Sequence, residues 1–187
     1  MARIPIPAVE KLTPEQRRVY DAIADLRAGH IPTHYHAALW SPELVDKWQQ
    51  LGELLRYRTG LPLRLSELAV LVVARHHDCQ YIWHAHAPAA LTAGVAGDVV
   101  EAMSKGERPT FGQRDEAAVY EYCTELLETK FVSTPVYARA LSVLEVTGIV
   151  ELTAFLGYYV MVAMARNAHD LPLPKGIAAP LAPVKRP

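Results

Sequence analysis

The chain has 187 residues, 51% of them hydrophobic and 21% charged, and 19 basic against 20 acidic residues leave a formal charge of −1. This length suits a single domain, spanning residues 1–187, with a sizeable core. The balanced charge, without a basic stripe or an acidic tail, argues against nucleic acid and against a membrane surface as partners. The high apolar content predicts that a subunit interface covers part of the surface, so we expect a homo-oligomer.

The distribution of apolar residues and cysteines predicts a cytoplasmic protein. Residues 1–16 contain no apolar run of the kind found in signal peptides. The longest apolar stretch, about residues 149–165, is interrupted by Glu151, Gly157 and several other polar or small residues, which favours a buried core helix over a membrane span. The two cysteines, Cys79 and Cys123, are too few for a disulfide framework and fit a reducing compartment.

Helix signals dominate the sequence, and strand signals are nearly absent. Thr13, Pro14 and Gln16 combine an N-cap, a proline in the first turn and a capping-box partner, and Ser41 with Pro42 repeats much of this device. The pattern predicts an all-α domain with helices at about 14–28, 41–58, 63–77, 79–93, 97–105, 113–129, 133–145 and 147–168.

Loops and helix ends follow from the same signals. Asp78 is the expected N-cap of the fourth helix, and Gly94 is its expected left-handed end. Residues 30–40, which contain three histidines, are expected to form a loop. The proline-rich tail, 170–187, should be extended and either draped on a neighbour or loose.

A carboxylate, a thiol and an imidazole stand at related positions in the central pair of helices. Glu67 precedes Cys79 by twelve residues, and His86 follows Cys79 by seven, which puts the last two on one helix face. A rise of about 1.5 Å per residue separates them by about 10 Å, so they should line one pocket without touching. Ile82 and Trp83 share this stripe and are expected to contact a substrate.

Each member of this trio has both a chemical and a structural interpretation. Cys79 at a helix start would gain a more stable thiolate from the unpaired N–H groups, or it would serve as a small buried apolar residue. Glu67 and His86 suit proton transfer, but they would equally suit a helix start and a satisfied core histidine. Spacing alone leaves these alternatives open.

Residues 64–95, RLSELAVLVVARHHDCQYIWHAHAPAALTAGV, resemble the carboxymuconolactone decarboxylase and alkyl hydroperoxidase D superfamily. The resemblance implies an all-α bundle of about seven to nine helices that assembles as a trimer, hexamer or dimer. It also implies that Glu67 and His86 are relay residues and that Cys79 is the first cysteine of the family's Cys-x-x-Cys pair. Ile82 stands where the peroxidatic members have their second cysteine, and Tyr81 lies at an intervening position. A dithiol mechanism is therefore incomplete in this chain.

Several further residues are candidates for binding a substrate. Arg75 is expected to hold a carboxylate through its forked guanidinium. The resemblance implies that the segment containing His34, His36 and Trp40 approaches the pocket. His84 and His86 point about 200° apart on a helix and so cannot share a metal ion, whereas His77 and His84 could; we expect no metal. The resemblance implies that no cofactor is needed.

These features predict a cofactor-independent lyase or isomerase that uses acid–base chemistry on a small organic acid or lactone. Glu67 and His86 would move the proton, Tyr81 would relay or orient, and Cys79 would assist as a donor or nucleophile. Two alternatives remain open: a one-cysteine antioxidant of the alkylhydroperoxidase type, with peroxidase activity through Cys79, and a non-catalytic binding module.

Overall fold

The computed structural model describes residues 2–182, and in this range it contains eight α-helices, one short 3-10 helix and no strand. The predicted all-α class and helix number are therefore confirmed. The described residues divide into two compact units, residues 2–58 with 165–172 and residues 59–164 with 173–182. The expectation of a single domain stays a prediction.

The first unit is built on three helices, α1 (Pro14–Asp25), α2 (Thr33–Ala38) and α3 (Pro42–Tyr57), preceded by the 3-10 helix η1 (Val9–Lys11). Thr13 and Gln16 form the predicted capping box at the start of α1, with the Gln16 N–H donating to the threonine oxygen at 3.3 Å. Both α1 and α2 pack against α3. The prediction that residues 30–40 form a loop was wrong, because Pro32 starts α2 as its N-cap and Tyr35 and Ala37 are buried.

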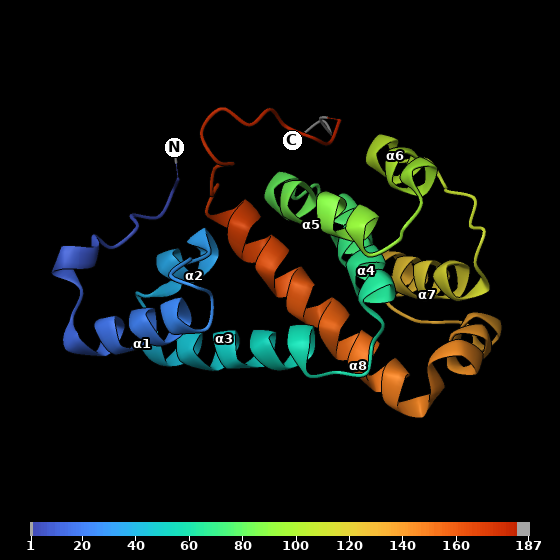
Figure 1. Cartoon of the computed structure of the whole chain (residues 1–187), viewed down its shortest axis with the longest axis horizontal. Coiled ribbons are helices and arrows are strands. Elements are labelled where there is room, and N and C mark those ends of the chain that lie inside the picture. Colours follow the sequence, from blue (N-terminus) through green and yellow to red (C-terminus); the bar gives the residue numbers. More distant parts are fainter. Residues whose placement is uncertain (1, 183–187) are drawn as a thin grey trace. The chain divides into compact units, whose positions relative to one another are not determined.

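The second unit centres on α4 (Leu63–His76), which packs against α5 (Gln80–Thr92), α6 (Gly97–Lys105) and α7 (Arg114–Thr129) (Figure 1). Ten consecutive residues of α4, Leu65 to Ala74, are buried, as expected of a helix covered on all sides. Arg64, at the start of α4, forms ion pairs of 2.6 Å with both Asp115 and Glu116 of α7. This double pairing fixes the register between the two helices.

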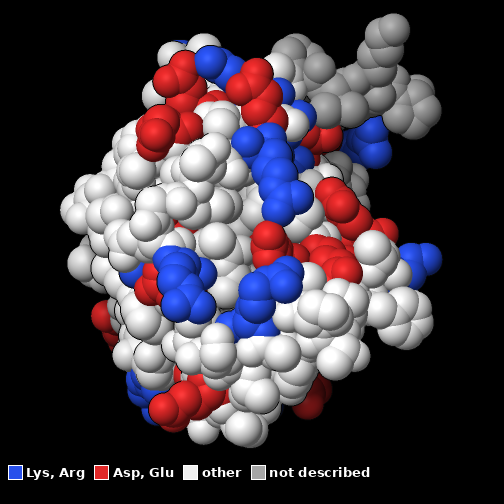
Figure 2. All heavy atoms as spheres, turned by 90° about the vertical axis from the view of Figure 1, so that its right-hand side faces the viewer, with Lys and Arg blue, Asp and Glu red and all other residues white. Residues whose placement is uncertain are grey.

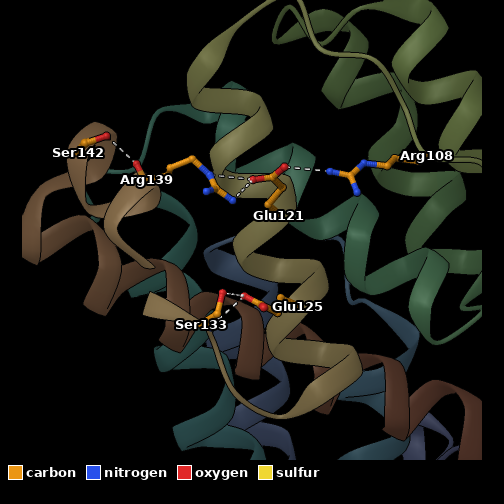
Figure 3. A network of polar contacts seen from close by, with 6 residues as sticks. All are labelled: Arg108, Glu121, Glu125, Ser133, Arg139 and Ser142. Carbon is orange, nitrogen blue, oxygen red and sulfur yellow. Dashed lines mark hydrogen bonds and ion pairs between the residues drawn. The ribbon is translucent and has the colours of Figure 1, made fainter. Parts of the chain in front are cut away.

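The longest helix, α8 (Thr134–Ala168), contains a break at Glu145, where φ is 58° and ψ is −178°. The predicted division into a helix ending near 145 and a longer one ending near 168 is thus confirmed. A charged network connects the first part of α8 to α7: Glu121 accepts hydrogen bonds from Arg139 at 2.7 and 3.0 Å and from Arg108 at 2.9 Å (Figure 3).

Among residues 2–182, α8 is the one helix that is long and apolar enough to cross a membrane. Of its most apolar 18-residue stretch, 44% is buried inside the protein. Core helices of soluble proteins meet the same criterion, and Leu152, Phe155 and Tyr159 of α8 are almost fully buried. On the face shown in Figure 2, acidic and basic side chains are interspersed among wide uncharged areas. No one-sign patch dominates that face.

The end of the described chain is extended and anchored on α5. The Gln80 side chain donates to the Leu181 carbonyl at 3.2 Å and accepts from the Leu181 N–H at 2.9 Å, and Leu181 is 1% exposed. Residues 171–182 contain no helix or strand, and the expectation of an extended tail, draped on a neighbour or loose, stays a prediction. Its last five residues lie outside the described part.

Candidate functional site

The turn between α4 and α5 positions Cys79. Asp78 adopts a left-handed conformation (φ 48°), the Asp78 N–H donates to the Arg75 carbonyl at 3.1 Å, and the Cys79 N–H donates to the Ala74 carbonyl at 2.8 Å. This is a Schellman motif, in which the last carbonyls of a helix are satisfied from beyond its end. Only three residues therefore separate the two helices, and α5 returns alongside α4.

Cys79, rather than Asp78, is the N-cap of α5, which corrects the predicted cap. The left-handed turn needs Asp78 to close α4, so the capping position moves to the next residue. The Cys79 carbonyl accepts the first bond of α5 from Trp83 at 3.1 Å, and the cysteine is 1% exposed. An N-cap residue stands at the end of a helix where negative charge is stabilised, but the Cys79 side chain makes no capping hydrogen bond to the first turn.

Glu67 and His86 form a buried hydrogen-bonded pair between α4 and α5. The distance from Glu67 Oε2 to His86 Nδ1 is 2.6 Å, and the two residues are 5% and 8% exposed. Because the carboxylate accepts, Nδ1 carries the proton, and in the neutral imidazole Nε2 then presents a lone pair. The pair thus defines which nitrogen can exchange a proton with a bound molecule.

Tyr159 of α8 contacts the other side of His86. Its hydroxyl lies 3.4 Å from Nε2, and the two rings meet edge to face with centroids 5.2 Å apart. Phe155 and Tyr158 pack against the Tyr159 ring, and the tyrosine is 3% exposed. A hydroxyl at this distance makes a weak hydrogen bond and is placed to follow a proton on Nε2.

Sequence reasoning missed Tyr159 and chose Tyr81. Tyr81 follows Cys79 by two residues and is half-buried, whereas the phenol beside His86 comes from 73 residues later in the chain. Tyr159 lies in a long apolar helix, where a tyrosine is expected to pack in the core or at an interface. The adjacent tyrosines Tyr158 and Tyr159 stand out in that apolar helix, but their distance from His86 in the sequence gives no reason to expect a contact.

The predicted binding residues are distributed over both units. In the second unit, Ile82 and Trp83 are buried on α5, at 2% and 3% exposure. Arg75 contacts the carboxylate of Asp78 at 3.3 Å and the Ser104 carbonyl at 3.4 Å. Its guanidinium is therefore already engaged by the protein.

In the first unit, the candidate residues use their ring N–H groups within the N-terminal segment. His36 Nε2 donates to the Pro7 carbonyl and Trp40 Nε1 donates to the Pro5 carbonyl, both at 2.7 Å. His34 is buried, with its ring centroid 5.4 Å from that of Trp48. A role for these three residues in binding a substrate stays a prediction.

No group of three or more His, Cys, Asp or Glu residues within residues 2–182 is arranged to hold a metal ion. The second cysteine, Cys123, is completely buried in α7, and burial raises the pKa of its thiol far above the ordinary value of 9.0. Cys79 is nearly as buried, at 1% exposure, and differs from Cys123 in standing at the N-cap of α5 instead of inside a helix.

Comparison with solved structures identifies the fold. The debrominase Bmp8, as a cysteine-to-alanine variant in complex with 2,3,4-tribromopyrrole, superposes with a TM-score of 0.71 at 14% identity, covering 95% of this chain and 92% of that one. The same debrominase without ligand gives a TM-score of 0.69 at 15% identity, covering 89% and 88% of the two chains. These identities show a shared fold alone.

Comparison by sequence gives the family. No curated protein matches the chain. The model of the carboxymuconolactone decarboxylase family matches residues 42–124, which include Glu67, Cys79 and His86. The resemblance seen in the sequence is thus confirmed over residues 42–124, which are similar to the carboxymuconolactone decarboxylase family.

Proposed function

We propose that the chain is a cofactor-independent enzyme that transfers protons on a small organic acid or lactone, as a lyase or isomerase. The observation that carries the proposal is the buried 2.6 Å hydrogen bond between Glu67 and His86. A carboxylate that holds Nδ1–H leaves Nε2 as a general base and stabilises the imidazolium that forms when it accepts a proton. The family match at residues 42–124 supports this class of chemistry.

In this scheme each group near the imidazole has one task. His86 Nε2 removes the acidic proton of the substrate and later returns it to the carbanion or enolate. Glu67 fixes the tautomer and the ring orientation, and the Tyr159 hydroxyl, 3.4 Å from Nε2, donates a hydrogen bond in the resting state. Cys79 contributes a donor near the first turn of α5.

The test compares isosteric variants on a carboxylated lactone. We expect Glu67→Gln and His86→Gln to lower the rate of decarboxylation or isomerisation by roughly 10²–10⁴, the range of a lost general base. His84→Gln is the matched control, because His84 lies on the same helix and takes no part in the pair. Full turnover in His86→Gln, or complete loss of activity in Cys79→Ser, would contradict the proposal.

A second function is thiol chemistry at Cys79, favoured by its N-cap position on α5. The thiolate would attack a hydroperoxide, forming a sulfenic acid and releasing an alcohol. An external thiol would condense with the sulfenic acid to a mixed disulfide with loss of water, and a second thiol would release Cys79 and leave as a disulfide with the first. The fold shared with a debrominase adds a halogenated heteroaromatic ring as a second electrophile to assay. Consumption of either compound in the presence of a thiol, abolished by Cys79→Ser and unchanged in Cys123→Ser, would select this function over proton transfer.

If neither a lactone, a hydroperoxide nor a halogenated ring turns over, the chain is a binding module. In that case His86→Gln and Cys79→Ser would change the affinity for a small ligand, and neither the unchanged protein nor the variants would show turnover.

A further inference from the structure

The second unit contains a cavity that is separate from the Glu67–His86 pair. Its volume is about 280 Å³, and it is formed by the facing sides of α4, α6 and α7 with the residues that follow α6. None of Glu67, Cys79, His86 and Tyr159 lines it. The lining residues are Val72, Arg75, His76, Met103, Gly106, Glu107, Tyr120, Thr124 and Glu128.

The helical register explains why these side chains meet. Tyr120, Thr124 and Glu128 are spaced by four residues and so form one stripe along α7. Val72 and Met103, which are 5% and 2% exposed, supply an apolar floor from α4 and α6. The cavity therefore has an apolar base, an aromatic wall and charged groups at its rim, the combination found in small-molecule sites.

One buried polar atom in this cavity lacks a partner. Within the described chain the Thr124 hydroxyl oxygen is shielded from solvent and has no hydrogen-bond partner. Leaving such a group unpaired is costly, so polar atoms of this kind are normally satisfied. A ligand with a hydrogen-bonding group above the apolar floor would satisfy it.

The charged side chains at the rim indicate whether a ligand would carry a positive or a negative charge. The Arg75 guanidinium is held by the Asp78 carboxylate at 3.3 Å, so these two charges offset each other. Within residues 2–182 the carboxylates of Glu107 and Glu128 accept no hydrogen bond and form no direct ion pair; Lys105, which pairs with Glu101, attracts Glu107 from a greater distance. Two carboxylates thus remain, and they favour a cation.

The aromatic wall and the donor set identify the kind of cation. Tyr120 lines the cavity, and an aromatic ring can attract an ammonium group. The rim carboxylates and His76 do not form a group able to hold a metal ion among the described residues. We propose that this cavity is a binding site for a small organic ammonium ion, with the charge near Glu107 and Glu128 and the carbon skeleton on Val72, Met103 and Tyr120.

The test uses benzylammonium as the probe and benzyl alcohol as its uncharged counterpart, in ligand-observed NMR titrations of the full chain. For a ligand of this size we expect a Kd on the order of 1 mM. Benzyl alcohol should bind at least about fivefold more weakly, because it lacks the charge that the carboxylates and the ring attract.

Variants locate the binding. Glu107→Gln combined with Glu128→Gln should weaken benzylammonium roughly fivefold to tenfold, and Tyr120→Leu should weaken it by a similar factor. Glu10→Gln, an exposed carboxylate of the first unit, is the matched charge control and should bind like the unchanged protein. Circular dichroism spectra of the variants serve as the control for folding.

Three outcomes would overturn the proposal. The first is equal affinity for benzylammonium and benzyl alcohol. The second is unchanged affinity in the double glutamine variant. The third is stoichiometric displacement of benzylammonium by millimolar Mg²⁺ or Ca²⁺, which would assign the site to a metal ion instead.

Discussion

Glu67 and His86 lie nineteen residues apart in sequence, and a 2.6 Å hydrogen bond joins their buried side chains. The three-residue connection between α4 and α5 makes this contact possible, because it returns the second helix directly along the first. A carboxylate and an imidazole that are both withdrawn from water interact more strongly than an exposed pair, since the local dielectric is lower.

Tyr159→Phe removes the hydroxyl beside His86 and keeps the ring packing. We expect turnover of the substrate to fall by about tenfold or less, because a contact of 3.4 Å is weak. The free energy of unfolding should fall by about 1 kcal/mol, the usual worth of one hydrogen bond. Steady-state kinetics and urea titration measure the two effects; a loss of activity as large as that of His86→Gln would show that Tyr159 itself transfers the proton.

Gln80→Ala releases the anchored tail beside the N-cap cysteine. The two hydrogen bonds between Gln80 and Leu181 disappear, so we expect Cys79 to become more accessible and to react faster with iodoacetamide, by severalfold. Mass spectrometry of the modified peptides follows the reaction, with Cys123 as the internal reference. Gln50→Ala, on α3 of the first unit, is the control and should leave the Cys79 rate unchanged.

Cys123 makes the stability of the protein depend on alkaline pH. Burial raises the folded-state pKa of this thiol, so above the ordinary value of 9.0 the unfolded chain loses a proton that the folded chain retains. The stabilisation is fully present below pH 9.0 and is lost as the pH rises, by up to about 1.4 kcal/mol per pH unit. Denaturant titrations at pH 8 and pH 10 should show a smaller decrease in Cys123→Ala than in the unchanged protein, whatever the cost of the substitution itself; equal decreases would contradict this account.

Arg64→Met keeps the length of the side chain and removes its charge. Glu116 is 2% exposed and would remain buried without its cation, so we expect a loss of about 3–5 kcal/mol in unfolding free energy. Adding Glu116→Gln to Arg64→Met should recover part of this loss, because the unpaired charge disappears. Urea denaturation measures both, and Arg17→Met, from an exposed ion pair, should have little effect on the free energy of unfolding.

The sequence predicted the parts of the fold that local signals encode. The capping box at Thr13, the left-handed position at Gly94 and the break near residue 145 are all present, since each depends on residues within one or two turns. Glu67 and His86 were chosen as proton-transfer residues, but their direct hydrogen bond was not predicted; the short turn between the two helices brings them together.

The contact of Tyr159 and the helix α2 were not predicted from the sequence. The approach of Tyr159 to His86 depends on how a helix formed much later in the chain packs onto α5, and the sequence holds no local pattern for that contact. Residues 33–38 were taken for a loop because the segment lacks a polar side-chain cap, and in the structure it is the packing of Tyr35 and Ala37 that accompanies the helix.

The short link between α4 and α5 also bears on the order in which the site assembles during folding. Closing the nineteen-residue segment between Glu67 and His86 costs less chain entropy than closing the 73 residues from His86 to Tyr159, by about 1.2 kcal/mol from the logarithmic dependence on loop length. Contacts that are close in sequence form early, so the helical hairpin should join its acid and base before the last long helix docks. A nascent chain would thus contain the carboxylate–imidazole pair while the tyrosine that completes it is still being synthesised.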